Sequence, residues 1–441
     1  MKGLSSKMVW TISGFVASSG MRFVLNIALS YLLAPDIMGV MLVVNAVRLG
    51  IELLTDVGIE QNIVHHPDGL DRAFRDTAWT MQVLRGFFLS LLFAAAAPFL
   101  AQTYHIDVRI FWLVACSPFL GGLHSTAIFA LVKQVEVRRR NQFELGSEML
   151  GFLVSVVLAY TLRSVWAPAL ALVCTVAIRS ALSYLLPDPA QQFRLDPQIR
   201  RRILHYGKWI MMTSLVMYAA TNLDRLYLGQ AVPLGLVGIY GIARAMAELP
   251  TNLARRLSYQ IIFPVMVHHR DDGADVDRAV ERTRLLFACA VCLALGVGTG
   301  LSDGVISLIY DPRYVSAGWI LAVLLVGGAF AVLSNLNEAL LLAAGRPAFS
   351  SFANGARFCT MAICLPAGLH WLGFPGAVMA IGFTEICQYG YISIGLTRLD
   401  RAPWRDDAIA ISAYVIALGG VCALRYGLGL NQPFQPIWGM L

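Results

Sequence analysis

Thirteen long apolar runs follow one another along this chain, and each is long enough to cross a hydrocarbon layer about 30 Å thick. They cover residues 9–33, 38–63, 79–102, 108–132, 145–162, 166–186, 206–231, 235–264, 283–301, 316–344, 349–371, 374–397 and 408–428. The runs are continuous and do not alternate, which favours helices over the strands of a barrel. Only 14% of the 441 residues are charged, against about 25% in soluble domains. The sequence therefore predicts an all-α polytopic membrane protein.

Lysine and arginine are distributed unevenly between the connections that join these runs. Twenty-one of them fall in connections on the side of the N-terminus, whereas the opposite connections hold only Arg109, Arg163, Arg313 and Arg425. Cytoplasmic connections carry the excess of positive charge in membrane proteins, so we expect a cytoplasmic N-terminus. The first run lacks a cleavage site and is expected to be retained. The net charge of +7 resides mostly in these loops and does not indicate a nucleic-acid partner.

The sequence contains no H-E-x-x-H, no G-x-S-x-G and no P-loop, so it offers no motif of a hydrolase or a nucleotide-driven pump. The longest outward connection, LSDGVISLIYDPRYVSA, is too short for the catalytic loop of a membrane-embedded sugar polymerase or ligase. Secondary transport is therefore favoured over an enzyme. A non-transporting scaffold is the alternative if the charged residues within the spans serve packing alone.

Cysteine and histidine pairs give no metal-binding pattern. Cys289 and Cys292 form a C-x-x-C, but it lies inside the apolar run LLFACAVCLAL. His-His pairs at 65–66 and 268–269 stand where helices leave the membrane, without a further Cys or His cluster nearby. We therefore expect neither a metal site nor a cofactor.

The two halves of the chain carry a weak internal repeat. Trp10, Gly39 and Gln61 match Trp209, Gly238 and Gln260 at a constant offset, and Pro35 lies within one residue of Pro233. Repeats of this kind place a transport site near the bilayer midplane between two bundles. We predict two pseudo-symmetric six-helix bundles around a central cavity, with twelve core helices and an extra C-terminal one. The predicted boundaries are 1–190 for the N-terminal lobe, 191–205 for a cytoplasmic linker, 206–400 for the C-terminal lobe and 401–441 for the extra helix and tail.

Several stretches resemble a known family. APDIMGVMLVVNAVRLGIELLTDVGIEQNIV resembles the first hairpin of bacterial polysaccharide flippases of the Wzx type, with its P-x-x-x-G turn and later D-x-G-x-x-x-x-I. NLDRLYLGQAVPLGLVGIYGIARAMAELP resembles their seventh and eighth helices, and IYDPRY and LLAAGRP resemble later segments. These proteins belong to the multidrug/oligosaccharidyl-lipid/polysaccharide exporter superfamily. The resemblance implies outward flipping of an undecaprenyl-pyrophosphate-linked sugar across the bacterial inner membrane, although a thirteenth span departs from the usual even number.

Charged residues near the middle of the spans form two stripes. Arg48, Glu52, Asp56 and Glu60 recur every four residues on the second span, and Arg244, Glu248, Asn252 and Arg256 do so on the eighth. Each such charge costs about 2.5–3.5 kcal/mol at the bilayer centre, so the stripes are expected to face a cavity together with Arg22 of the first span. The alternative is that Arg48–Glu52 and Arg244–Glu248 are intrahelical pairs that only support packing. Arg85 and Arg179 lie close enough to span ends to extend toward water.

These stripes yield the candidate site residues. A planar guanidinium matches the oxygens of a pyrophosphate. Relatives that flip the peptidoglycan precursor are similar in placing arginines on their first, second and eighth helices. The substrate-binding candidates are Arg22, Arg48, Arg244 and Arg256, and the candidates for coupling or gating are Glu52, Asp56, Asp224 and Glu248.

The adjacent pair Asp224–Arg225 stands inside the apolar seventh span. Asp224 lies about 27 Å along that helix, near its outer end. Adjacent side chains diverge by about 100° on a helix, so the two cannot simply neutralise each other. We expect Arg225 to reach the outer interface and Asp224 to pair with the other lobe as an outward gate. A helix-end anchor without a gating role is the alternative.

Two functions stay open at this point. The first is a lipid-linked oligosaccharide flippase that works by alternating access, with H+ or Na+ as the candidate coupling ion and the polysaccharide polymerase machinery as a candidate partner. The second is a cation-coupled multidrug-type exporter of the same superfamily, which the deep arginines disfavour.

The charge asymmetry predicts the topology directly. In a background without the eight natural cysteines, a single cysteine next to Arg139 or Arg201 is expected to be shielded from an impermeant thiol reagent in intact cells. A cysteine next to Asp36 or Tyr104 is expected to be labelled. Consistent labelling of the first pair would reverse the predicted orientation.

Overall fold

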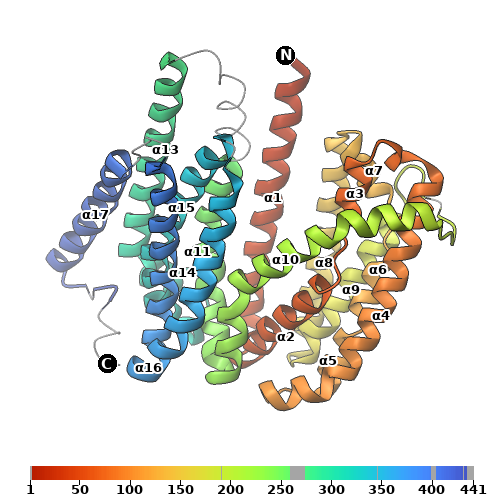
Figure 1. Ribbon diagram of the computed structural model, residues 1–441. Coiled ribbons are helices and arrows are strands. Elements are labelled where there is room, and N and C mark those ends of the chain that lie inside the picture. The colour runs from red at the N-terminus through yellow and green to blue at the C-terminus, as the bar shows by residue number, and fades with distance from the viewer. Residues whose placement is uncertain are drawn as a thin grey trace. The chain divides into compact units, whose positions relative to one another are not determined.

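The computed structural model describes residues 2–189, 191–258, 274–344, 346–398, 404–430 and 432–434, and the regular elements in these ranges are helices. The chain forms two compact units (Figure 1). The first unit comprises residues 1–219 and 225–238, and the second comprises residues 220–224 and 239–441.

The first unit is built from ten helices over its described residues, with a short 3-10 turn at Pro67–Leu70. They are α1 (Lys2–Leu32), α2 (Pro35–Leu53), α3 (Ile59–His65), α4 (Arg72–Tyr104), α5 (Val108–Val114), α6 (Ser117–Gly122), α7 (Ala127–Lys133), α8 (Val137–Leu162), α9 (Trp166–Ser183) and most of α10 (Pro197–Ala231). Helix α8 packs against α1 and α9, and α4 packs against α5 and α6.

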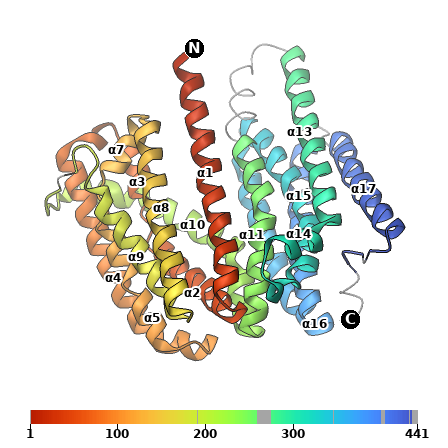
Figure 2. The ribbon, with the colours of Figure 1, turned by 180° about the vertical axis from the view of Figure 1, so that it is seen from behind.

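The second unit contains most of α11 (Leu234–Leu257), then α13 (Ala274–Gly300), α14 (Ser302–Ile309), α15 (Ala317–Ala343), α16 (Pro347–Thr397) and α17 (Trp404–Gly427). Helix α13 lies beside α15 and α17, and α15 lies beside α16 (Figure 2). Helix α16 bends at Gly373, whose φ of +63° suits a residue without a side chain. The spans predicted at 349–371 and 374–397 therefore follow each other without a loop.

The structure confirms an all-α protein of many apolar helices. Most of each of the thirteen predicted spans is helical in the described residues, although breaks interrupt 38–63 and 108–132, and 259–264 lies outside the described residues. Within those residues, seven helices are long and apolar enough to cross a membrane. The bent pair Val108–Gly122 and Ala127–Lys133, with an angle of 56°, makes an eighth if it counts as one span. Helices α2, α10 and α11 fall short of this measure because charged and polar residues interrupt their apolar runs.

The second predicted span is broken, which corrects the expected stripe. Helix α2 ends at Leu53 and α3 begins at Ile59, and between them Gly58 adopts a left-handed conformation with φ +59°. The side chain of Asp56 lies in this break and accepts a hydrogen bond from the Gly58 N–H at 3.1 Å. Asp56 and Glu60 therefore do not continue a helical face begun by Arg48, and the prediction of one continuous stripe is wrong.

The matched glycines of the repeat meet in the first unit. A Cβ atom added to Gly39 would lie 1.8 Å from the carbonyl oxygen of Leu234, and one added to Gly238 would lie 2.0 Å from that of Pro35. The first turns of α2 and α11 thus pack backbone against backbone, and each needs a residue without a side chain at this point.

The extra C-terminal helix is an integral part of the second unit. At one end of α17, the buried Arg284 of α13 donates to Asp407 at 2.9 Å and to Asn337 of α15 at 2.6 Å. At the other end, Arg425 donates to Asp303 at 2.6 Å. The sequence places Arg425 among the outward connections. The structure buries both arginines inside helices, where each one contacts an acidic partner.

Helix α10 belongs mainly to the first unit, unlike in the predicted division, which assigned residues from 206 onward to the C-terminal lobe. The Tyr218 hydroxyl donates to the Ala46 carbonyl oxygen at 2.5 Å, and its ring packs against Gly50. These contacts attach α10 to α2 as far as residue 219.

We predict that Gly39→Ala destabilises the protein because the new methyl group overlaps the Leu234 carbonyl. Overpacking of this kind costs about 1–3 kcal/mol. The matched control is Gly20→Ala in α1, since no atom lies within 4 Å of its added Cβ. Thermal unfolding of the purified proteins in detergent measures the difference, and equal midpoints for the two variants would contradict the prediction.

Candidate functional site

The first unit encloses a polar cavity of about 590 Å³, within the range of about 300–1,000 Å³ typical of ligand pockets. Helices α2, α3, α4, α6, α7, α8 and α9 contribute to its wall. Its charged lining residues are Arg48, Arg85, Arg140 and Arg179 together with Glu52, Asp56, Glu60 and Glu144. The cavity therefore gathers all four members of the predicted helix-two stripe, although a helix break separates them.

Ion pairs neutralise part of this lining. Arg48 Nη1 donates to Glu52 Oε1 at 2.6 Å, and the same guanidinium contacts Asn45 Oδ1 at 3.2 and 3.3 Å. Arg179 Nη2 donates to Glu144 Oε1 at 2.8 Å. The intrahelical pair foreseen for Arg48 and Glu52 is thus present, and it faces the cavity at the same time. The packing interpretation and the functional one are compatible at this position.

Arg85 explains how α2 can end within the apolar part of the protein. Its guanidinium donates to the backbone carbonyl of Glu52, and its Nε donates to Thr55 Oγ1 at 3.0 Å. The last four carbonyl groups of a helix lack a partner inside the helix, and Arg85 supplies one at the end of α2. Arg85 and Arg179 both line the cavity, and 41% of the Arg179 side chain stays exposed.

Arg22 lies apart from this cavity. Its Nη2 donates to Ser18 Oγ at 2.7 Å and lies 3.6 Å from Glu148 Oε1 on α8, while 64% of its side chain stays exposed. Ser18 in turn donates to Glu148 at 2.8 Å. Arg22 is therefore a partly exposed cation whose carboxylate partner belongs to a neighbouring helix.

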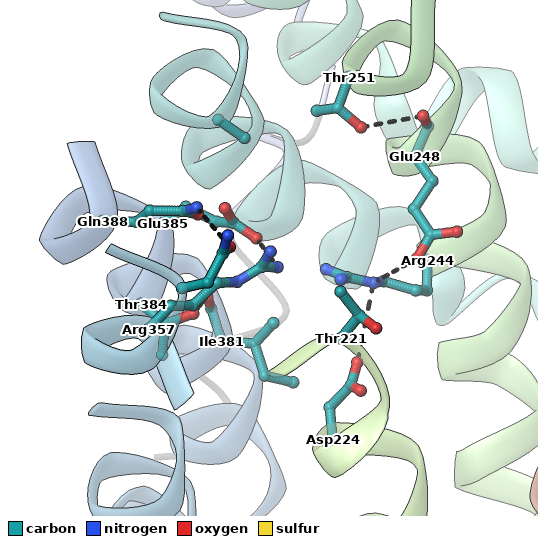
Figure 3. A network of polar contacts seen from close by, with 12 residues as sticks. Thr221, Asp224, Arg244, Glu248, Thr251, Arg357, Ile381, Thr384, Glu385 and Gln388 are labelled. Carbon is teal, nitrogen blue, oxygen red and sulfur yellow. Dashed lines mark hydrogen bonds and ion pairs between the residues drawn. The ribbon is translucent and has the colours of Figure 1, made fainter. Parts of the chain in front are cut away.

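A second cluster of charges lies within the second unit (Figure 3). Arg244 Nε donates to Glu248 Oε1 at 2.9 Å and lies 3.7 Å from Asp224 Oδ2. The Tyr240 hydroxyl donates to the same oxygen of Asp224, whose side chain is fully buried. Asp224 Oδ1 has no hydrogen-bond partner among the described residues. Asp224 thus pairs within its own unit, which corrects the expectation of a partner in the other lobe.

Two members of this region escaped the sequence analysis. Arg357 and Glu385 of α16 form an ion pair, and the Arg357 guanidinium points toward Arg244 (Figure 3). Next to them, Gln388 Nε2 donates to Asn354 Oδ1 at 3.2 Å. The only signal in the sequence was one arginine and one acid inside two apolar runs. They are 28 residues apart, so no spacing rule for a single helix could join them.

The outer part of the predicted eighth-span stripe lies nearer the protein surface. Arg256 is exposed near the end of α11, and the Asn252 side chain accepts from Arg255 at 2.6 Å. The predicted eighth-span stripe therefore has its buried part at Arg244 and Glu248. Arg225 is half-buried on α10.

The histidines predicted to lie where helices leave the membrane contact aromatic rings in the part that the structure describes. His65 stacks on Tyr206 at 5.4 Å, and His66 stacks on Phe74 at 5.0 Å. The histidines at 268–269 lie outside the described residues. In the part of the chain that the structure describes, no group of three or more His, Cys, Asp or Glu side chains is arranged to hold a metal ion.

The fold is that of a multi-pass membrane transporter. It is similar to the lipid II flippase MurJ in its inward closed conformation, with a TM-score of 0.75, 12% identity and coverage of 98% of this chain and 96% of that one. It is also similar to an inward-facing multidrug resistance transporter of the MATE family, with a TM-score of 0.67, 16% identity and coverage of 87% and 94%.

The chain belongs to the polysaccharide biosynthesis protein family, which matches residues 28–318. It is 20% identical over 302 residues to the teichuronic acid biosynthesis protein TuaB of Bacillus subtilis, a match that covers 67% of this chain and 62% of TuaB. It is 21% identical over 387 residues to the amylovoran biosynthesis protein AmsL of Erwinia amylovora, covering 85% of this chain and 98% of AmsL. The resemblance inferred from the sequence is thereby confirmed.

We predict a graded loss of stability from the buried Asp224 cluster. Asp224→Ala leaves the buried Arg244 with one carboxylate fewer, and breaking a buried ion pair costs about 3–5 kcal/mol. Tyr240→Phe removes one hydrogen bond to a charged group, worth about 1.5–3 kcal/mol. Asp311→Ala, which breaks a surface pair with Arg313, is expected to cost at most about 1 kcal/mol. Thermal unfolding in detergent should follow this order, and an unaltered Asp224→Ala protein would contradict the burial argument.

Proposed function

We propose that this protein flips an undecaprenyl-pyrophosphate-linked oligosaccharide from the cytoplasmic to the periplasmic leaflet of the bacterial inner membrane. Its two lobes would alternate access to the two sides, with the N-terminus in the cytoplasm. The product would enter the synthesis of a surface or exported polysaccharide. Membership of the polysaccharide biosynthesis family and the similarity to a lipid II flippase support this class of substrate.

One observation carries the proposal: the cavity of the first unit holds arginines that are neutralised by acids of the same wall. Arg48 is bound by Glu52, and Arg179 is bound by Glu144. In the empty state these pairs lower the cost of keeping charge among apolar helices. A pyrophosphate offers the same oxygen geometry as a carboxylate pair and can take the place of the acid at the guanidinium. Binding is then an exchange of partners that keeps the guanidinium paired and leaves the displaced carboxylate free to take up a cation.

The acids released in this exchange are the candidates for ion coupling. Glu52 and Asp56 line the cavity of the first unit, and Glu248 binds Arg244 in the second. A proton or a sodium ion taken up by one of them would free its arginine for the substrate. Ion occupancy and lipid occupancy would then be linked through a direct contact.

The second candidate is a cation-coupled multidrug exporter, and the similarity to a MATE family transporter is the observation in its favour. Such a site would hold an organic cation through carboxylates. The four arginines in the cavity wall oppose that use, because their positive charges would repel an organic cation that approached the neighbouring carboxylates.

The arginines provide the test. We predict that Arg48→Ala abolishes polymer export in a strain that lacks the natural gene, with membrane levels of the protein unchanged. Arg244→Ala is expected to abolish export as well, and its membrane level is compared with that of Asp224→Ala because both variants break the same buried pair. Arg22→Ala is expected to act in the same direction, and lysine at position 48 or 244 should restore export only in part because it lacks the planar fork. Arg255→Ala, an exposed residue of α11, is the matched control.

A direct assay separates the two functions. In proteoliposomes, flipping of a fluorescent undecaprenyl-pyrophosphate-linked oligosaccharide should require Arg48, and efflux of an organic cation such as ethidium should be absent. Ethidium efflux that survives Arg48→Ala would favour the multidrug exporter. Normal polymer export by all three alanine variants would refute the role of the arginines.

A further inference from the structure

We propose that the end of the first unit's cavity formed by α3, α7 and the start of α8 is a saccharide-binding site. In this site Glu60, Gln61, Arg140 and His124 contact the sugar of the substrate. The inference rests on the proposed function and adds to it the part of the substrate that the cavity recognises.

The polar groups at this end are available for a ligand. Among the described residues, the side chains of Glu60, Gln61 and Arg140 take part in no hydrogen bond or ion pair, although all three line the cavity. Arg48 and Arg179, by contrast, are held by acids. A carboxylate, an amide and a guanidinium together offer both acceptors and donors. A sugar hydroxyl needs both, because it donates one hydrogen bond and accepts others.

The chain brings these groups together through two breaks in its helices. The break after α2 places Glu60 and Gln61 at the start of α3, and α3 packs against α7. Helix α7 packs in turn against α8, whose first turn carries Arg140. Leu89 of α4 and Pro118 of α6 add apolar groups to the lining. Along α4 the cavity runs from Gln82 to Leu89, about 10 Å at the rise of a helix.

A second break between helices determines the position of His124. Helix α6 ends at Gly122 and α7 begins at Ala127, and His124 stands between them. Its carbonyl oxygen accepts a hydrogen bond from Gln82 Nε2 at 3.0 Å, so the backbone is held to α4. The imidazole packs near Phe129 and Phe143, with ring centroids 6.4 and 5.8 Å away. Phe129 lines the cavity as well and gives it a flat apolar wall beside the polar groups.

The balance of charges in the lining favours a neutral sugar over a phosphate at this end of the cavity. The lining holds four arginines and four acids, so these residues give the cavity no net charge. At Arg48 and Arg179 a pyrophosphate gains only by displacing the acid that already binds the guanidinium. A neutral sugar can bind without opening an ion pair, provided that donors and acceptors without a protein partner face it. Glu60, Gln61 and Arg140 supply them.

The test compares two lipids that differ only in the sugar. Purified protein in nanodiscs is titrated with lipid-linked oligosaccharide extracted from bacteria that produce the protein, and separately with undecaprenyl pyrophosphate. The double variant Gln61→Ala/Arg140→Ala should bind the sugar-bearing lipid about tenfold or more weakly, because lost hydrogen bonds leave hydroxyl groups unpaired. Its affinity for undecaprenyl pyrophosphate should stay within about twofold of wild type, since the paired arginines are untouched.

Two controls accompany the variant. Arg139→Ala removes the same charge from the neighbouring exposed position, which does not line the cavity, and should leave both affinities unchanged. His124→Ala should weaken binding of the sugar-bearing lipid alone. This variant repeats the test at the part of the lining between α6 and α7. Retained affinity for undecaprenyl pyrophosphate shows that each variant is folded.

The outcomes are distinct. Equal weakening for the two lipids, or no weakening for either, would overturn the saccharide site and leave the proposed flippase intact. A wild-type protein that binds neither lipid would refute the proposed function and with it this inference.

Discussion

The neutralisation of charges among apolar helices is the constraint on which this structure depends. Breaking one buried ion pair costs about 3–5 kcal/mol, a large share of the stability of a typical protein. In the described residues, Arg48, Arg244 and Arg284 each have an acid within 3 Å. Arginines that serve packing, such as Arg284, and arginines that face a cavity, such as Arg48, obey the same rule. Pairing alone therefore does not distinguish a packing arginine from one that lines a cavity.

Irregular backbone is concentrated where the first unit is polar. Helix α2 stops before Gly58, and the span that follows α4 is bent by 56°. Both breaks expose backbone carbonyls that a membrane helix would satisfy internally. Arg85 and Gln82, both on α4, supply the missing donors at the two breaks. Helix α4 therefore stabilises the two breaks, and the breaks place side chains such as His124 in the cavity.

Hydropathy predicted the helices because long apolar runs leave few alternatives within a membrane. The pair Arg48–Glu52 was predictable for a similar reason, since a spacing of four residues fixes the geometry on one helix. Partners on different helices were beyond this reasoning. Arg357 with Glu385 and Arg284 with Asp407 depend on tertiary packing. The break at Gly58 was also missed, because an apolar run reads as one helix whether or not a glycine adopts a left-handed conformation within it.

The reciprocal contact at Gly39 and Gly238 bears on how far sequences of this kind can diverge. Main-chain atoms make the contact, so its shape depends on two small residues and hardly on the side chains around them. Mutational drift in the flanking positions can then replace nearly every side chain without moving the two helix starts apart. Only the two small residues at this junction must be kept, so the contact is compatible with a fold that is shared at only 12% identity.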